Sequence, residues 1–219
     1  MITVSLNSRE ARVQIRNIIL DWSGTLVNDL RPVWQTTNRV LETYGATPLT
    51  LEQFREEFRL PIREFYREHL PHVPLEELSE VFLRYYAGVR HQIAPLPHAG
   101  AFLQFCAERA MPVFVASSVD HETYRLQMKR FGFDGYITRP YLAMTDKTQQ
   151  IPRILLENRL IARQTIFVGD MEHDIAAGRA AGVRTCAVLT GYSPARKLRA
   201  MQPDCVCEHL GELQEKLRG

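Results

Sequence analysis

The sequence lacks a long apolar run. No stretch approaches the roughly 18 consecutive apolar residues of a membrane-spanning helix, so no membrane partner is expected. The first 16 residues also lack the apolar core of a secretory signal peptide, because polar residues interrupt them at Asn7, Arg9, Glu10 and Arg12. Charge of one sign is not in excess either: the net charge is +2, which argues against a nucleic-acid partner. We therefore expect a cytoplasmic protein.

Cysteines are few, with four in 219 residues. Cys106 falls in an apolar helical pattern, and Cys186, Cys205 and Cys207 lie in short β-like runs. The Cys-Val-Cys spacing of the last two does not match the usual patterns of zinc ligands. We expect all four to be small core side chains, which suits a reducing cytosol.

What is present is the composition of an ordinary globular chain, with 45% hydrophobic and 24% charged residues. The length suits one large domain, or one domain with a small inserted one. Residues 18–20 form an apolar run that predicts a strand buried on both faces. Ligands of open α/β sheets bind just outside the carboxyl ends of strands. Asp21, which ends this strand, is therefore expected at a reactive position.

Residues 28–94 carry helical patterns and no strand pattern. Pro32 lies in the first turn of one predicted helix, which Gly45 ends. Thr50 and Gln53 fit a capping box that begins a second helix, and further helices are predicted at 62–69 and from residue 75. We expect a small helical domain over 28–94, inserted into an α/β domain formed by residues 1–27 and 95–219.

Strand and helix patterns alternate after residue 95. Strands are predicted at 112–116, 135–138, 165–168, 185–189 and 205–207, and helices at 101–110, 122–131, 149–158, 175–181 and 210–217. A further short helix is expected to be capped by Ser193 and opened by Pro194. A weak alternation at residues 1–6 suggests an additional edge strand or the arm of a hairpin. Repeated strand–helix units predict a parallel sheet with helices on both faces.

Polar residues gather at or near the ends of the predicted strands: Asp21 with Ser23 and Thr25, then Ser117, Lys147, and Asp170 with Asp174. A carboxylate such as Asp21 can attack an electrophilic phosphorus. Attack by an anion on a phosphate requires charge neutralisation, which Mg²⁺ can provide. The candidate Mg²⁺ ligands are the carboxylates of Asp21 and Asp170 and the backbone carbonyl of Ser23, with Asp174 placed to hold a metal-bound water.

The remaining groups of this constellation can bind a phosphoryl group. Lys147 offers a point charge to both nucleophile and phosphate. Hydroxyl and backbone N–H groups of Thr25, Ser117 and Ser118 can bind phosphoryl oxygens. Gly24 allows the loop after Asp21 to fold closely around the ligand.

The order and spacing of these residues resemble the motifs of the haloacid dehalogenase superfamily of hydrolases. Asp21-Trp22-Ser23-Gly24-Thr25-Leu26 is similar to the nucleophile loop, Val113 to Ser117 to the second motif, Lys147 to the third, and Val168 to Asp174 to the metal motif. The helical insert resembles the small cap of the subgroup that contains phosphoglycolate phosphatases and β-phosphoglucomutases. The resemblance implies a Rossmann-like core with an α-helical cap, Mg²⁺ as cofactor, and phosphatase activity.

One position departs from the family pattern. Two residues after the nucleophile, the family's phosphatases usually carry a second aspartate that protonates the leaving group, and here the residue is Ser23. A serine hydroxyl is too weakly acidic for that role near neutral pH. The chain can still be a phosphatase that uses another group or prefers a good leaving group, or it can be a catalytically silent domain that binds a phosphate ligand or a partner.

Two further alternatives fit less well. Phosphonoacetaldehyde hydrolases also lack the second aspartate, but they use a cap lysine as a Schiff base, and the first lysine here is Lys129, after the insert. Dehalogenases need no metal, which would leave Asp170 and Asp174 unexplained. We therefore expect a phosphatase.

The substrate is expected to be a small phosphorylated metabolite, because a lid over a pocket at the sheet end admits little else. In the insert, Arg63 lies between Arg59 and Arg67 near Pro61, and it could clamp a second anionic group of that substrate. The oligomeric state is expected to be a monomer or a homodimer.

Overall fold

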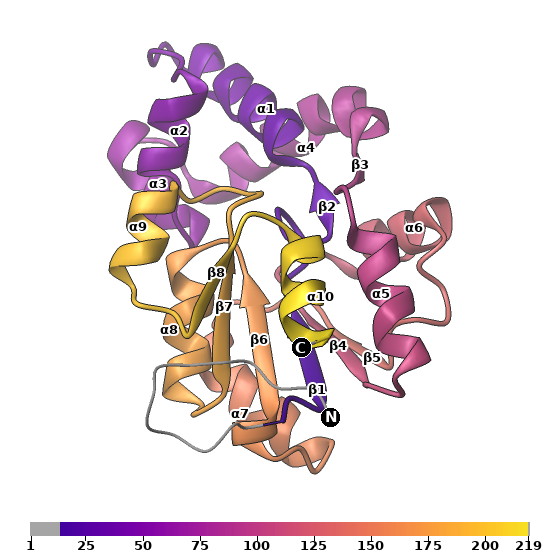
Figure 1. Ribbon diagram of the computed structural model, residues 1–219. Helices are drawn as coiled ribbons and strands as arrows, with labels where there is room; N and C mark the ends of the chain where they lie inside the picture. Colours follow the sequence, from indigo (N-terminus) through magenta and orange to yellow (C-terminus); the bar gives the residue numbers. More distant parts are fainter. Residues whose placement is uncertain (1–13, 219) are drawn as a thin grey trace.

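A six-stranded parallel sheet forms the centre of the computed structural model, which describes residues 14–218 (Figure 1). Its strand order is β5-β4-β1-β6-β7-β8, and every neighbouring pair is parallel. The strands are β1 (Asn17–Leu20), β4 (Val113–Ala116), β5 (Arg139–Tyr141), β6 (Thr165–Gly169), β7 (Arg184–Val188) and β8 (Cys205–Cys207). The expected α/β fold class is confirmed.

Helices cover both faces of the sheet. One face carries α5 (Ala99–Glu108), α6 (His121–Phe131) and α10 (Leu210–Arg218), and the other carries α7 (Lys147–Glu157), α8 (Glu172–Ala180) and α9 (Ala195–Ala200). Successive strand side chains point to opposite faces. In β1, Ile18 and Leu20 therefore join the core under α5 and α10, and Ile19 joins the core under α7. A short 3-10 helix, η2 (Ala162–Gln164), precedes β6.

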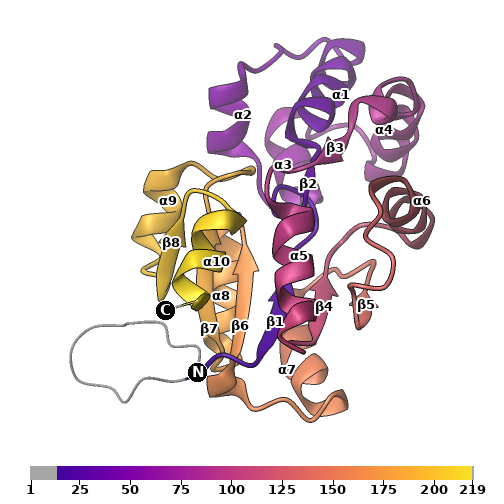
Figure 2. The ribbon, with the colours of Figure 1, turned by 45° about the vertical axis from the view of Figure 1, so that its right-hand side comes forward.

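A separate unit of four helices follows β1: α1 (Leu30–Thr43), α2 (Leu51–Glu57), α3 (Ile62–His69) and α4 (Leu75–Val89), extended by the 3-10 helix η1 (Arg90–Gln92). It lies beyond the carboxyl ends of the sheet strands (Figure 2). A two-stranded antiparallel ribbon of β2 (Val27–Asn28) and β3 (Ala94–Pro95) stands where the chain enters and leaves it. The domain division at 27/28 and 94/95 stays a prediction, and this ribbon falls on both of its boundaries.

Two sequence signals in the helical unit, a capping box and a glycine after a helix, form the local structures that they predict. The α2 capping box forms as predicted: Gln53 N donates to Thr50 Oγ1 at 3.1 Å, and Thr50 N donates to Gln53 Oε1 at 2.8 Å. Gly45 follows α1 with a φ of +75°, a left-handed conformation that glycine adopts without steric cost. The unit has its own core, in which Phe54, Phe65 and Leu78 are fully buried.

Several expectations of local structure are wrong, among them the start of the helix predicted at 175–181, which begins at Glu172. The strand predicted at 135–138 begins only at Arg139, because residues 133–136 form a turn in which Tyr136 N donates to Phe133 O and Gly135 has a φ of +86°. The helix predicted from residue 149 begins at Lys147, where the Asp146 side chain caps it. Ser193 does not cap α9, because its hydroxyl bonds Glu172 instead.

The strand suggested at residues 1–6 lies outside the described residues. Within residues 14–218, no helix combines the length and apolar character needed to cross a membrane.

Candidate active site

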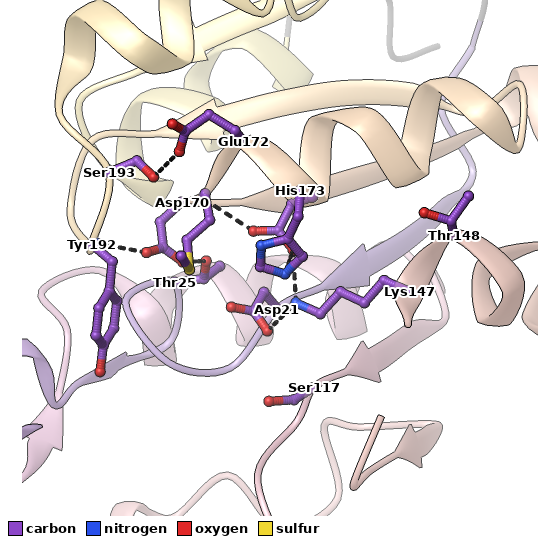
Figure 3. A network of polar contacts seen from close by, with 12 residues as sticks. Asp21, Thr25, Ser117, Lys147, Thr148, Asp170, Glu172, His173, Tyr192 and Ser193 are labelled. Carbon is purple, nitrogen blue, oxygen red and sulfur yellow. Dashed lines mark hydrogen bonds and ion pairs between the residues drawn. The ribbon is translucent and has the colours of Figure 1, made fainter. Parts of the chain in front are cut away.

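Three adjacent strands deliver polar side chains to one edge of the sheet. Asp21 follows β1, Ser117 follows β4 and Asp170 follows β6, in the strand order β4-β1-β6. Lys147 is the first residue of α7, and Asp174 lies in the first turn of α8. Figure 3 shows the side chain of Lys147 directed at Asp21, whereas the carboxylate of Asp170 is turned toward Tyr192 and Thr25. The residues that the sequence analysis grouped are thus brought together.

Lys147 links two of the carboxylates. Its Nζ lies 2.7 Å from Oδ1 of Asp21 and 2.7 Å from Oδ1 of Asp174, and all three side chains are buried. Burial alone would lower the pKa of the lysine, but the charges of Asp174 and Asp21 outweigh it and raise the pKa above its usual value. Lys147 therefore stays charged and fixes the orientation of Asp21.

Asp170 accepts hydrogen bonds from a hydroxyl and a backbone N–H, and from no basic side chain among residues 14–218. Thr25 Oγ1 donates to its Oδ1 at 3.2 Å, and the backbone N–H of Tyr192 donates to its Oδ2 at 2.7 Å. Glycine is required on both sides, because a Cβ at Gly24 or Gly191 would overlap the carboxylate. Burial, followed by the charges of Asp21 and Asp174, raises the pKa of Asp170 well above its usual value.

These carboxylates fit a divalent cation. One oxygen from each of Asp21, Asp170 and Asp174 lies within 4.8 Å of the others. Three ionised carboxylates with one lysine would leave two uncompensated negative charges in a buried space. Mg²⁺ prefers oxygen ligands and one or two carboxylates. The donor set therefore suits Mg²⁺, whereas the contribution of the Ser23 carbonyl stays a prediction.

The hydroxyl groups expected to bind phosphate differ in their surroundings. Ser117 is buried, its Oγ accepts from Val119 N at 3.2 Å, and it lines the cavity described below. Ser118 is exposed but lines the same cavity. Thr25 and Gly24 lie against Asp170 and are not among the residues that line the cavity. Their role toward phosphate stays a prediction.

A cavity of about 780 Å³ lies between the strand ends and the helical unit. Asp21, Ser23, Ser117 and Lys147 form its polar floor. Most other walls are apolar or aromatic, from residues such as Phe58, Leu60, Tyr66, Phe82, Tyr86 and Leu126. Arg63 is exposed on α3 and is not among the lining residues, so the structure does not bring it to the cavity; Arg90 and Arg130 do line it.

Sequence reasoning missed Asp29. It occupies the N-cap position of α1 but makes no capping bond; its carboxylate instead accepts hydrogen bonds from the hydroxyl groups of Tyr192, at 3.1 Å, and Ser23. Burial raises its pKa to about 6. Asp29 lines the cavity, so a second carboxyl does stand beside Ser23. An aspartate directly before a helix ordinarily indicates a cap, so only its contacts with residues distant in the sequence reveal this position.

His173 lies between the two acidic residues of the metal motif, and the sequence predicts that it faces solvent or packs in the loop and is not a ligand, because Mg²⁺ prefers oxygen. Its ring lies beside Lys147 in Figure 3. Its Nε2 atom lies 3.2 Å from Asp174 Oδ1 but without hydrogen-bond geometry. Burial lowers its pKa, so the ring is neutral near pH 7. It packs against the ion pairs and adds no charge to them.

Comparisons with known proteins agree with this geometry. Residues 18–188 match the family described as haloacid dehalogenase-like hydrolase. The chain is 24% identical over 209 residues to a pyrophosphatase PpaX of Halalkalibacterium halodurans, covering 92% of this chain and 96% of the relative. It is 28% identical over 153 residues to a phosphoglycolate phosphatase of Yersinia pestis, covering 67% and 66%.

Solved structures share the fold. A haloacid dehalogenase-like hydrolase of Streptococcus pneumoniae superposes with a TM-score of 0.79 at 19% identity, over 92% of this chain and 97% of that one. A β-phosphoglucomutase structure from Thermotoga maritima, described as putative in its source, gives a TM-score of 0.71 at 16% identity, over 93% and 99%.

Proposed function

The chain belongs to the haloacid dehalogenase-like hydrolase family, and on that premise we propose that it is a Mg²⁺-dependent phosphatase with Asp21 as nucleophile. The observation that carries the proposal is the buried contact of Lys147 with both Asp21 and Asp174, next to Asp170, on the floor of a cavity. A network of this kind neutralises and orients an attacking carboxylate. Residues 28–94 would act as the cap over it.

In the proposed reaction, an Asp21 oxygen attacks phosphorus, a P–O–Asp bond forms, and the bond to the leaving oxygen breaks. Lys147 holds the carboxylate that attacks, and the Ser117 hydroxyl faces the same cavity to bind a phosphoryl oxygen. Mg²⁺ held by Asp21 and Asp170, with Asp174 close by, would supply positive charge to the phosphoryl group. Water then hydrolyses the aspartyl phosphate, releasing inorganic phosphate and restoring Asp21.

Ser23 determines which leaving groups suit the enzyme. It lines the cavity at the position from which a family phosphatase protonates the leaving oxygen, and its hydroxyl donates to Asp29 instead. An oxygen that leaves as a stable anion, such as a phenolate, needs little protonation. We propose faster turnover of aryl or acyl phosphates than of simple alkyl phosphates.

The cavity supports a substrate with a largely apolar organic part. The relatives' names give pyrophosphate and phosphoglycolate as substrates, and both are small and polar throughout. Here the space is about 780 Å³ and its walls are mainly aromatic and aliphatic, which favours apolar contacts with a ligand. We propose a phosphate monoester whose carbon part packs against Phe82 and Tyr86, within reach of Arg90 and Arg130 at the cavity wall.

The test is a steady-state phosphatase assay with and without Mg²⁺. The panel is p-nitrophenyl phosphate, a medium-chain alkyl phosphate, phosphoglycolate and pyrophosphate. We expect turnover of the aryl ester that requires Mg²⁺ and disappears in Asp21→Asn. Metal binding without turnover of any panel member would favour the alternative, a silent phosphate-binding domain.

A matched pair of variants tests the cavity. Phe82→Ala should raise KM for the apolar esters, because Phe82 lines the cavity. Arg63→Ala is the control, because Arg63 is exposed and lies outside the lining. An equal effect of the two variants on KM would contradict the proposed substrate class.

A further inference from the structure

Three of the four cysteines meet at the outer edge of the sheet. Cys186 lies on β7, and Cys205 and Cys207 lie on β8. The parallel pairing places Cys186 opposite Cys205. Residues two apart on a strand point to the same face, so Cys205 and Cys207 share the face of Cys186. The sequence predicted that all four cysteines are small core side chains; burial is confirmed for Cys106, Cys186 and Cys207, and Cys205 is half-buried.

The thiols are spaced as ligands of one ion. Their three Sγ atoms all lie within 4.8 Å of one another, and those of Cys186 and Cys207 are 3.8 Å apart. Sulfur ligands about 2.3 Å from a metal stand about 3.8 Å apart in a tetrahedral site and about 4.0 Å apart in a trigonal one. The cluster therefore needs less than about 1 Å of closure to surround an ion.

We propose that Cys186, Cys205 and Cys207 form a binding site for a soft metal ion, with Cu⁺ as the ion that fits best. Thiolate ligands select Cu⁺ and Zn²⁺ among biological metals. Structural zinc sites almost always have four protein ligands. Among the described residues, the cluster contains no fourth histidine, cysteine or carboxylate ligand, which favours an ion that accepts three sulfurs.

The surroundings allow entry of the ion. Glu212 and Lys216 lie near Cys207 and form an ion pair with each other at 3.0 Å. Cys205 is the half-buried member and offers the route from solvent. The site is independent of the proposed catalysis, because β7 and β8 are two and three strands away from β1.

The test is a titration of the full-length, reduced protein with Cu⁺ under anaerobic conditions against a chromogenic Cu⁺ chelator. We expect one Cu⁺ per chain, and X-ray absorption should show three sulfur neighbours. Cys205→Ser should weaken binding at least tenfold, and Cys106→Ser is the matched control because Cys106 lies on α5, outside the cluster. Circular dichroism verifies folding, and Cys207→Ala is the second cluster variant.

Other results would overturn the proposal. Binding no tighter in the unmodified chain than in Cys205→Ser, or an equal loss in Cys106→Ser, would show that the cluster is only core packing. Displacement of bound Cu⁺ by equimolar Zn²⁺ would contradict the assignment of the ion. A reduced chain that binds no Cu⁺ but forms a Cys186–Cys207 disulfide in air would indicate a redox pair instead. Phosphatase activity should be the same in Cys205→Ser as in the unmodified chain. The test of the metal site therefore does not depend on the proposed function.

Discussion

The hydroxyl of Tyr192 donates a hydrogen bond to Oδ1 of Asp29 at 3.1 Å, inside the cavity that contains Asp21. Burial raises the pKa of Asp29 to about 6 from an ordinary value of 3.8. A carboxyl with a raised pKa binds its proton more tightly in the folded chain. Its contribution to stability is therefore present below about pH 4 and lost as pH rises toward and through 6.

Asp29→Asn should stabilise the protein above pH 6. Asparagine keeps a hydrogen-bond acceptor without a buried charge, so the free energy of unfolding at pH 7.5 should rise by about 1 to 3 kcal/mol. The gain should shrink toward pH 4, where Asp29 is protonated. Urea unfolding at several pH values measures this difference. The prediction would be contradicted if the gain in free energy of unfolding over the unmodified chain were smaller at pH 7.5 than at pH 4.

Asp120→Ala is the control, because its effect on stability at neutral pH should have the opposite sign to that of Asp29→Asn. The Asp120 carboxylate caps α6 by accepting hydrogen bonds from Glu122 N and Thr123 N. Burial raises the pKa of Asp120, but these hydrogen bonds outweigh burial and the pKa is lowered. Its stabilisation is therefore present above pH 4 and lost as pH falls. Its removal should cost about 0.5 to 2 kcal/mol at pH 7.5.

Restoring the family aspartate at position 23 should require a second change. Ser23→Asp alone would place a carboxylate against buried Asp29, and like charges disfavour ionisation of both. In the double variant that combines Ser23→Asp with Asp29→Asn, that repulsion is absent. We expect kcat for alkyl phosphates to rise at least about tenfold over Asp29→Asn, because general acid catalysis typically contributes about 10²- to 10⁴-fold.

Aryl phosphates are the internal control for this pair of substitutions. Their leaving groups need little protonation, so their kcat should change by less than about threefold. A fall in alkyl phosphate turnover would mean that Ser23 serves another role and that the missing acid does not limit the rate.

Much of the fold and site follows from local sequence pattern, and the remainder depends on contacts between distant residues. Asp21, Ser117 and Asp170 end apolar runs, and parallel strands deliver their ends to one sheet edge, so their meeting could be predicted. Arg63 could not be placed, because the face of α3 that meets the cavity depends on how the helical unit docks. The cysteine cluster depends on the register of β7 with β8, which local pattern does not reveal.

Lys147→Met should abolish activity and destabilise the protein, because it leaves Asp21 and Asp174 without their shared cation. Breaking a buried ion pair in this way costs about 3 to 5 kcal/mol. Thermal unfolding should show that Mg²⁺ restores part of this loss, since a divalent cation can offset the same charges. Lys129→Met, at an exposed position on α6, should shift stability by less than about 0.5 kcal/mol. Equal melting temperatures for the two variants would contradict the assigned role.

Gly191→Ala should weaken the proposed metal site without disturbing the backbone. Gly191 does not have a positive φ, but its Cβ would overlap the Asp170 carboxylate, which Tyr192 N and Thr25 Oγ1 hold in place. Asp170 must therefore move, and we expect the Mg²⁺ concentration for half-maximal activity to rise at least about tenfold. Gly100→Ala is the control, because a Cβ at Gly100 would have its nearest neighbour at 3.9 Å. Gly100 lies in α5, and alanine in place of glycine within a helix should raise the free energy of unfolding by about 0.5 to 1 kcal/mol. An unchanged Mg²⁺ requirement in Gly191→Ala would show that Asp170 does not hold the metal.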